Sequence, residues 1–146
     1  MGVIASIVFL ALEIRQNTVT ARASAYQAIG IATASLLSSD SHDEQFVLAS
    51  LKTADELTAL DWARLRLSRL AYSRLGETII LQVEQGLLPP DAVERLGYQT
   101  WKTWRQSPIG ACLWPSVSRS ASETFRQFVE DGPEPITIDC TQFDEL

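Results

Sequence analysis

The sequence predicts an all-α fold, a single helical bundle of about five to six helices with a long N-terminal helix. Residues 3–37 contain no proline, and their apolar and small side chains recur at the three- and four-residue spacing of a helix. Two later segments, 59–85 and 91–105, show the same periodicity between turn-forming residues. Residues 1–131 contain no linker and form one predicted domain, which an acidic tail, 132–146, follows.

The N-terminal helix begins with an apolar segment, Val3–Leu12, within an apolar helix start at residues 1–14. At ~1.5 Å per residue the segment covers about half of a ~30 Å hydrocarbon core, so it is too short to span a bilayer. It is either an interfacial or buried helix end, or a membrane anchor truncated at its start. Two alternatives have less support from the sequence. One is a signal peptide cleaved near Ala21–Ala23, and the other is N-myristoylation at Met1–Ser6.

Capping and turn residues delimit the next two helices. The long helix should end in the polar cluster 38–41, and a short helix should cover 43–52. Thr58-x-x-Asp61 is close to a capping box and opens the helix 59–85. We expect the main buried stripe of that helix to consist of Leu60, Ala63, Leu67, Leu70, Ala71, Thr78 and Leu81.

Three further helices are predicted towards the C-terminus. Pro89-Pro90 breaks the chain before the helix 91–105. Ser107-Pro108 opens a short helix that Pro115 terminates or kinks. Ser120-x-x-Glu123 caps the last helix, which Gly132-Pro133 stops.

Length and charge limit the class of protein. A chain of 146 residues buries roughly 68–70% of its extended surface on folding, which stabilises a core without a metal or a disulfide. Nothing in the sequence therefore requires a cofactor. The 18 acidic residues outnumber the 12 Lys and Arg, whereas a nucleic-acid surface needs clustered positive charge. We expect no nucleic-acid partner.

The two cysteines indicate the redox state of the compartment. Cys112 and Cys140 stand in different segments without CxxC or Cys/His spacing. This pattern is typical of reduced thiols in the cytoplasm rather than of a disulfide framework.

The acidic tail, 132–146, has a composition that is usually solvated. The alternation of Ile136 and Ile138 with polar residues also allows the tail to lie against the bundle.

The segment Ile14–Gln27 carries the pattern I-R-Q-N-T-x-x-x-R-A-x-A-x-Q. It resembles the opening of an uncharacterised family of bacterial proteins, in which one N-terminal membrane helix runs into this motif and then into a small helical domain. Later landmarks at Gln85–Leu88, Trp101-x-x-Trp104 and Phe125–Val129 are similar as well. The resemblance implies a membrane-attached helical domain and brings no known activity. Family members carry a longer apolar stretch before the motif, which indicates a truncated or misassigned start.

Several arginines fall on apolar helix stripes, where an unpaired guanidinium would cost several kcal/mol. We predict that the first and third helices share a polar layer in which Glu77 is the main partner of these arginines. The alternative is that the side chains extend to solvent at the edge of the bundle. The residues of this predicted layer are Arg15, Arg22, Gln27, Arg74 and Glu77.

Three tryptophans, Trp101, Trp104 and Trp114, lie close together in the sequence. They could line an aromatic pocket or contact a membrane surface, although core packing is the commoner use of such residues. The single histidine, His42, lies in a polar turn without neighbours suited to catalysis. The signatures of common hydrolases, NTPases and zinc proteases are absent, so we assign no catalytic, cofactor or metal residue.

The leading functional hypothesis is a non-enzymatic accessory or interaction protein at the cytoplasmic face of a bacterial inner membrane. Its membrane or protein partner would bind through the apolar segment, and Arg15 and Arg22 favour the cytoplasmic side. The competing hypothesis is a soluble cytoplasmic ligand-binding or sensor bundle, in which the apolar segment packs inside a homo-oligomer.

Overall fold

The computed structural model describes residues 2–140 and confirms the all-α class. These residues contain seven α-helices, one short 3-10 helix and no strand. In chain order the helices are α1 (Gly2–His42), α2 (Glu44–Ser50), η1 (Ala54–Glu56), α3 (Ala59–Glu84), α4 (Ala92–Arg95), α5 (Thr100–Trp104), α6 (Pro108–Ser118) and α7 (Glu123–Glu130).

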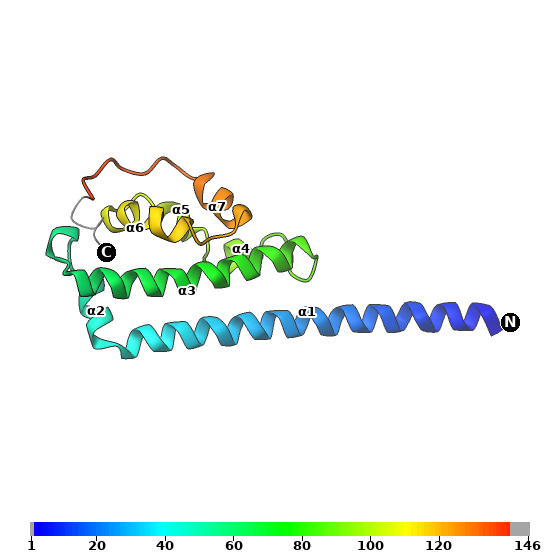
Figure 1. Ribbon diagram of the computed structural model, residues 1–146. Coiled ribbons are helices and arrows are strands. Elements are labelled where there is room, and N and C mark those ends of the chain that lie inside the picture. Colours follow the sequence, from blue (N-terminus) through cyan, green and yellow to red (C-terminus); the bar gives the residue numbers. More distant parts are fainter. Residues whose placement is uncertain (1, 141–146) are drawn as a thin grey trace.

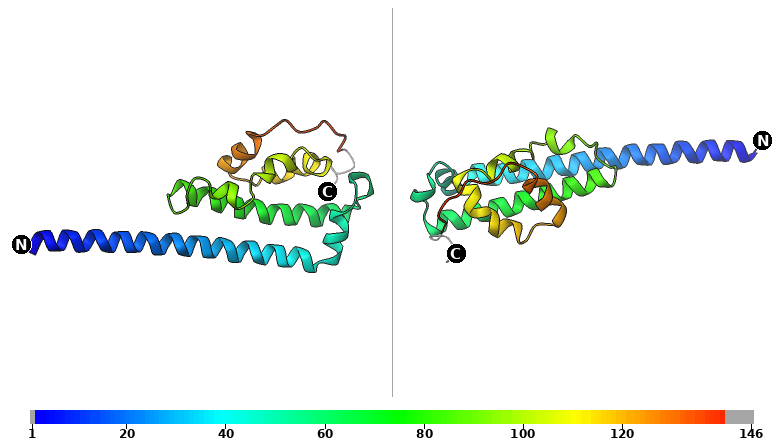
Figure 2. Two further views of the ribbon diagram at one scale, coloured as in Figure 1. Left: turned by 180° about the vertical axis from the view of Figure 1, so that it is seen from behind. Right: turned by 90° about the horizontal axis from the view of Figure 1, so that it is seen from above.

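The helices form layers on the two sides of α3 (Figures 1 and 2). α1 lies along one side and runs antiparallel to α3, while α6 and α7 lie on the other side. Ala92 of α4 and Tyr98 of the α4–α5 turn belong to the core cluster that also contains residues of α1 and α3. α2 and η1 connect α1 to α3 at the end of the molecule far from the N-terminus. Because α1 has 41 residues and α3 has 26, the N-terminal part of α1 projects beyond the rest of the molecule.

The start of α3 follows the predicted capping box. The N–H of Asp61 donates to Oγ1 of Thr58 (3.2 Å), and the N–H of Thr58 donates to Oδ2 of Asp61 (2.9 Å). These two bonds satisfy donors that an uncapped helix would leave unpaired. Lys52 Nζ adds a 2.7 Å ion pair to the same carboxylate oxygen, so Asp61 also fixes the preceding segment.

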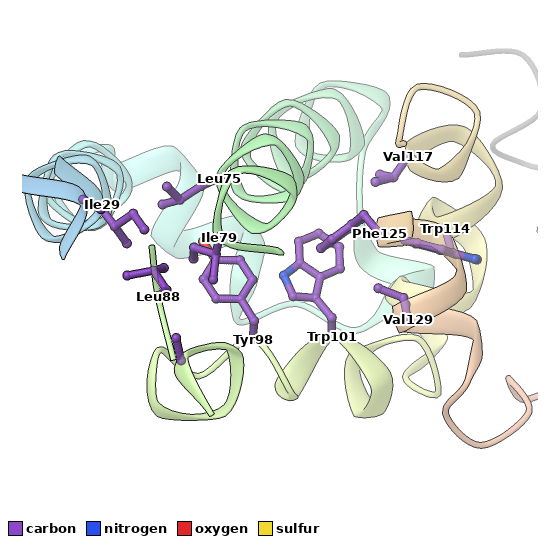
Figure 3. Packing of buried hydrophobic residues seen from close by; sticks show 12 residues of the cluster. Ile29, Leu75, Ile79, Leu88, Tyr98, Trp101, Trp114, Val117, Phe125 and Val129 are labelled. Atoms are coloured by element: carbon purple, nitrogen blue, oxygen red, sulfur yellow. The ribbon is translucent and has the colours of Figure 1, made fainter. Parts of the chain in front are cut away.

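The single helix predicted over 91–105 is wrong, because the chain forms α4 and α5 with a turn between them. Gly97 lies in this turn with φ of +77°, a conformation that glycine adopts without steric cost. A left-handed glycine ends a helix even where apolar periodicity continues. The turn leads into Tyr98 and Trp101, which pack towards α3 (Figure 3).

The two last helices settle two boundaries near the C-terminus. Of the two alternatives for Pro115, termination is excluded, because α6 continues to Ser118. α7 begins two residues later than expected, because Ser122 instead of Ser120 caps it. Oγ of Ser122 accepts a 3.3 Å hydrogen bond from the N–H of Phe125.

The prediction of the main buried stripe of α3 is wrong, because none of its seven residues is buried. Leu70 and Ala71 are half-buried, and the other five are exposed, Leu60, Leu67 and Leu81 among them. Since α3 is covered on two sides, its apolar residues extend around more than one face, and periodicity alone could not identify the buried face. The residues of α3 that the structure buries are Asp61, Trp62, Leu65, Ser73, Leu75, Gly76 and Ile79.

The main core lies between α1, α3 and the C-terminal helices (Figure 3). Ala25 and Ile29 of α1 contribute to it, and the small side chain of Ala25 lets the two long helices approach closely. A second cluster around Trp62 and Leu113 joins α2, α3 and α6. Trp104 packs against both clusters, so the two cores are continuous.

The expectation of free thiols is wrong, because Cys112 of α6 and Cys140 of the tail form a disulfide across 28 positions of sequence. Nothing in the spacing of two cysteines reveals such a pair, since the approach depends on the path of the tail. The start of the tail is also held, because Nη2 of buried Arg105 donates to the carbonyl oxygen of Pro133 (2.9 Å). The described part of the tail is therefore held at Pro133 and at Cys140, while residues 133–139 between these points are exposed, Ile136 and Ile138 among them. The rest of the predicted tail, from residue 141, lies outside the described residues.

Candidate functional site

The apolar segment is a surface that the rest of the molecule leaves uncovered. Its exposed large side chains are Val3, Ile4, Ile7, Val8, Phe9, Leu10 and Leu12. They point to every side of the helix: at 3.6 residues per turn, Ile4, Leu12 and Phe9 lie about 100°, 180° and 240° around the axis from Val3. A helix that is apolar on all sides is typical of a membrane or a protein interior, whereas one partner helix covers only a stripe.

α1 has the length and composition of a membrane-crossing helix over Val3–His42. Signal sequences and the core helices of soluble proteins can share these properties. A core helix does not fit here, because none of the apolar window is buried. Beyond the apolar segment the helix continues unbroken, and the hydroxyl of Thr18 donates to the carbonyl oxygen of Ile14 (2.9 Å), so that this polar group is satisfied within the helix.

Two of the predicted polar-layer residues pair with each other. Arg74 Nη1 donates to Oε2 of Glu77 (2.9 Å) within α3. The other oxygen of Glu77 accepts a hydrogen bond from the N–H of Ser122, at the start of α7. Glu77 therefore joins α3 to α7, on the side of α3 away from α1.

The remaining three residues of the predicted layer lie on α1. Arg22 Nε donates to the carbonyl oxygen of Gly86 (3.3 Å), just beyond the end of α3. Arg15 and Gln27 are exposed. The structure thus divides the five residues between two places, and they do not form one hydrogen-bonded layer.

The three tryptophans lie close together, with Trp101 next to each of the other two. The ring centroid of Trp101 lies 5.1 Å from that of Trp104 and 6.4 Å from that of Trp114. Trp101 also contacts Phe125 edge to face, at 5.4 Å between centroids. Most of this cluster belongs to the core (Figure 3), but one side of Trp101 faces a pocket.

This pocket, of about 530 Å³, lies between α1, α2, α3 and the α4–α5 turn. We call it the Arg69 pocket. Its volume falls in the range of about 300–1,000 Å³ that is usual for small-molecule sites. Its lining residues are Thr33, Leu37, Asp40, Ser41, Phe46, Val47, Ser68, Arg69, Tyr72, Leu96, Gly97, Tyr98, Thr100 and Trp101.

The guanidinium of Arg69 lies over two aromatic rings. Its Cζ lies 5.0 Å from the centroid of the Trp104 ring and 6.0 Å from that of Trp101. Burial lowers the pKa of Arg69, while the nearby Tyr72 and Asp40 act in the opposite direction. Within residues 2–140, no carboxylate oxygen lies within 4.0 Å of this guanidinium.

Asp40, the acidic residue of the pocket, is engaged by hydroxyl groups. Its Oδ2 accepts a 2.8 Å hydrogen bond from Oγ of Ser68. The hydroxyl of Tyr72 also interacts with this carboxylate, and burial followed by the charge of Asp40 raises the pKa of Tyr72. The pocket therefore contains a carboxylate that is engaged by hydroxyl groups, and an arginine that has no ion-pair partner among residues 2–140.

Two residues that line the pocket, Tyr98 and Thr33, have buried hydroxyl groups without a hydrogen-bond partner among the described protein groups. Because these two oxygen atoms have almost no accessible surface, they do not face the open space of the pocket. Tyr98 is only 6% exposed. Its side chain extends from the α4–α5 turn towards α3, beside Ile79 (Figure 3). Burial raises the pKa of Tyr98, so the phenol remains a neutral donor. Buried polar groups are normally paired, and unpaired ones need an explanation.

Trp101 was among the predicted site residues, whereas Arg69 was not. The sequence contains a signal for it, because Arg69 follows Trp62 and Leu65 at spacings of seven and four on the face that α3 buries. Arg74, the arginine of α3 that was predicted to need a partner, lies instead on an exposed face. Among the described residues, no group of three or more His, Cys, Asp or Glu side chains is arranged to hold a metal ion.

Comparisons of the chain with family models, with curated proteins and with solved structures gave no match. The resemblance of Ile14–Gln27 to a bacterial family therefore stays a prediction.

Proposed function

We propose that this chain is a non-enzymatic accessory protein held at a bacterial inner membrane by the N-terminal part of α1. The observation that carries the proposal is the apolar segment, whose seven large side chains are exposed on all sides of the helix. Burying each of them stabilises by roughly 1.5–3 kcal/mol, and a bilayer can cover them all. The non-enzymatic part rests on the absence of catalytic signatures from the sequence.

Two features bear on the side of the membrane at which the helical domain lies. Arg15 and Arg22 follow the apolar segment and favour the cytoplasmic face. The Cys112–Cys140 disulfide favours an oxidising compartment. The positive-inside rule compares both ends of a span, and these arginines describe one end only. We therefore give the disulfide more weight and place the domain on the outer face.

A soluble ligand-binding or sensor bundle is the second candidate function, and the Arg69 pocket is the observation that favours it. In that case the apolar segments of several copies would cover one another in a homo-oligomer. A bundle of at least three or four such helices is needed to surround a helix that is apolar on every side.

Fractionation of the full chain expressed in bacteria tests the proposal. We expect the protein in the membrane pellet, resistant to high salt and released by detergent. Ile7→Asp should shift it to the soluble fraction or to aggregates, because a carboxylate at the centre of a membrane helix costs about 2.5–3.5 kcal/mol.

Ile31→Asp is the matched control. Ile31 is 63% exposed and Ile7 is 62% exposed, and both lie on α1, but Ile31 belongs to the half that runs beside α3. This variant should remain in the pellet. A wild-type chain that is soluble and monomeric without detergent would overturn the proposal, and a soluble oligomer of defined size would support the second candidate.

A further inference from the structure

We propose that the Arg69 pocket binds a small monocarboxylate with a planar, aromatic body, whose carboxylate pairs with Arg69. This inference is independent of the membrane anchor, because α1 contributes Thr33, Leu37 and Asp40 to the pocket from its C-terminal half. The pocket has room for such a molecule, at about 530 Å³.

The arrangement of Arg69 leaves its hydrogen-bonding edge available. The Cζ atom of Arg69 lies over the rings of Trp104 and Trp101. The five N–H groups of the guanidinium lie in its plane, and none of them forms an ion pair with a carboxylate of residues 2–140. A planar fork of N–H donors matches a carboxylate, which it binds through two parallel hydrogen bonds.

The charge of the pocket limits the ligand to a single negative charge. Arg69 is the one cationic side chain of the lining, and Asp40 opposes it with a negative charge. A phosphate dianion would be repelled by Asp40 and would lack a second cation. The walls that Trp101, Tyr72 and Phe46 provide favour an aromatic body, which aromatic side chains contact edge to face or by offset stacking.

Titration of the purified full chain with three small probes tests the inference. The probes are phenylacetate, its neutral amide and the cationic phenethylamine, which share one ring and differ in charge. Trp101 and Trp104 adjoin Arg69, so indole fluorescence should report binding. We expect a saturable change with phenylacetate and binding at least ~10-fold weaker for the other two, since charge-assisted pairing is lost.

Arg69→Gln should weaken phenylacetate binding ~10-fold or more. Arg66→Gln, which removes the same charge from an exposed position of α3, is the matched control and should bind like the wild type. Equal binding by the Arg69→Gln variant, or no saturable binding of phenylacetate up to ~20 mM, a concentration at which even weak fragments bind, would overturn the inference.

The comparison of the three probes needs only the wild-type chain, so it tests the inference even if the Arg69 variant does not fold. Equal binding of phenylacetate and its neutral amide would contradict the pairing of a carboxylate with Arg69.

Discussion

Gly76 of α3 and Phe125 of α7 approach so closely that a β-carbon on Gly76 would lie 2.5 Å from Cε2 of Phe125. The same atom would lie 2.9 Å from Cδ1 of Tyr98. No ordinary contact is that short, and Phe125 is fully buried, so its ring cannot move into solvent. The absence of a side chain at Gly76 is therefore what lets α7 and the α4–α5 turn pack on α3.

Gly76→Ala should destabilise the fold by about 1–3 kcal/mol, because the added methyl group forces the two rings apart. Gly30→Ala is a control for which we expect the opposite change in stability. Gly30 lies inside α1 with nothing within 4 Å of the added carbon, so alanine should stabilise by about 0.5–1 kcal/mol. Urea unfolding of both variants measures the two effects. Equal stabilities would show that the α3–α7 contact is looser than the structure indicates.

The disulfide between Cys112 and Cys140 should contribute about 2–4 kcal/mol to the free energy of unfolding, because it closes a long loop in the unfolded chain. Replacing both cysteines by serine should lower the Tm. Reductant should lower the Tm of the wild type by a similar amount and leave the variant unchanged, which serves as the control.

The redox state also reports the compartment of the domain. Alkylation of thiols at the moment of cell lysis, followed by mass measurement, should find neither cysteine modified if the domain faces an oxidising compartment. Modification of both cysteines would place the domain in the cytoplasm.

Arg105 holds the end of α7 and the start of the tail. Its buried guanidinium donates to the carbonyl oxygens of Glu130, Gly132 and Pro133. Arg105→Ala should cost about 1.5–3 kcal/mol, because carbonyl groups lose a charged donor. Arg119→Ala, at an exposed position, should change stability by less than about 0.5 kcal/mol. Thermal unfolding compares the two variants, and similar losses for both would contradict the anchoring role of Arg105.

Asp61 should make the stability of the protein depend on acid pH. The hydrogen bond from Lys52, followed by those from the N–H and hydroxyl of Thr58, lowers the pKa of Asp61 to about 2. The unfolded-state pKa is ~3.9, so the contribution is complete above about pH 4 and disappears as the pH falls through about 2.

Asp61→Asn should therefore lower the Tm at neutral pH and reduce the fall in Tm between about pH 4 and pH 2. Asp91→Asn, in an exposed ion pair with Arg95, is the control and should retain the steeper fall. The same acid dependence in both variants would exclude Asp61 as its source.

Local signals predicted much of the fold. The capping box at Thr58 and the unbroken periodicity of the first helix gave correct elements, because both depend on residues close in sequence. The break at Gly97 was missed although a glycine within a periodic run is itself a local signal. The buried face of α3 was harder, since two layers cover that helix.

The candidate site depends on contacts that no local pattern contains. The spacing of Trp101 and Trp104 left an aromatic pocket, a membrane contact and core packing open, and Asp40 and Arg69 come from helices whose relative position only the fold determines. The same holds for the Cys112–Cys140 pair, which requires the tail to return to α6. The five residues of the predicted polar layer are divided because Glu77 pairs with Arg74 and with Ser122 of the α7 cap, away from α1.

The continuity of α1 sets the distance between the apolar segment and the Arg69 pocket. One unbroken helix contains the apolar segment and a wall of the pocket, and it rises about 30 Å from Leu12 to Thr33 at ~1.5 Å per residue. α1 is thus a spacer of set length. Under the proposed membrane attachment, with the helix upright in the bilayer, the pocket would stand clear of the headgroups, and its ligand would arrive dissolved in water, not through the bilayer.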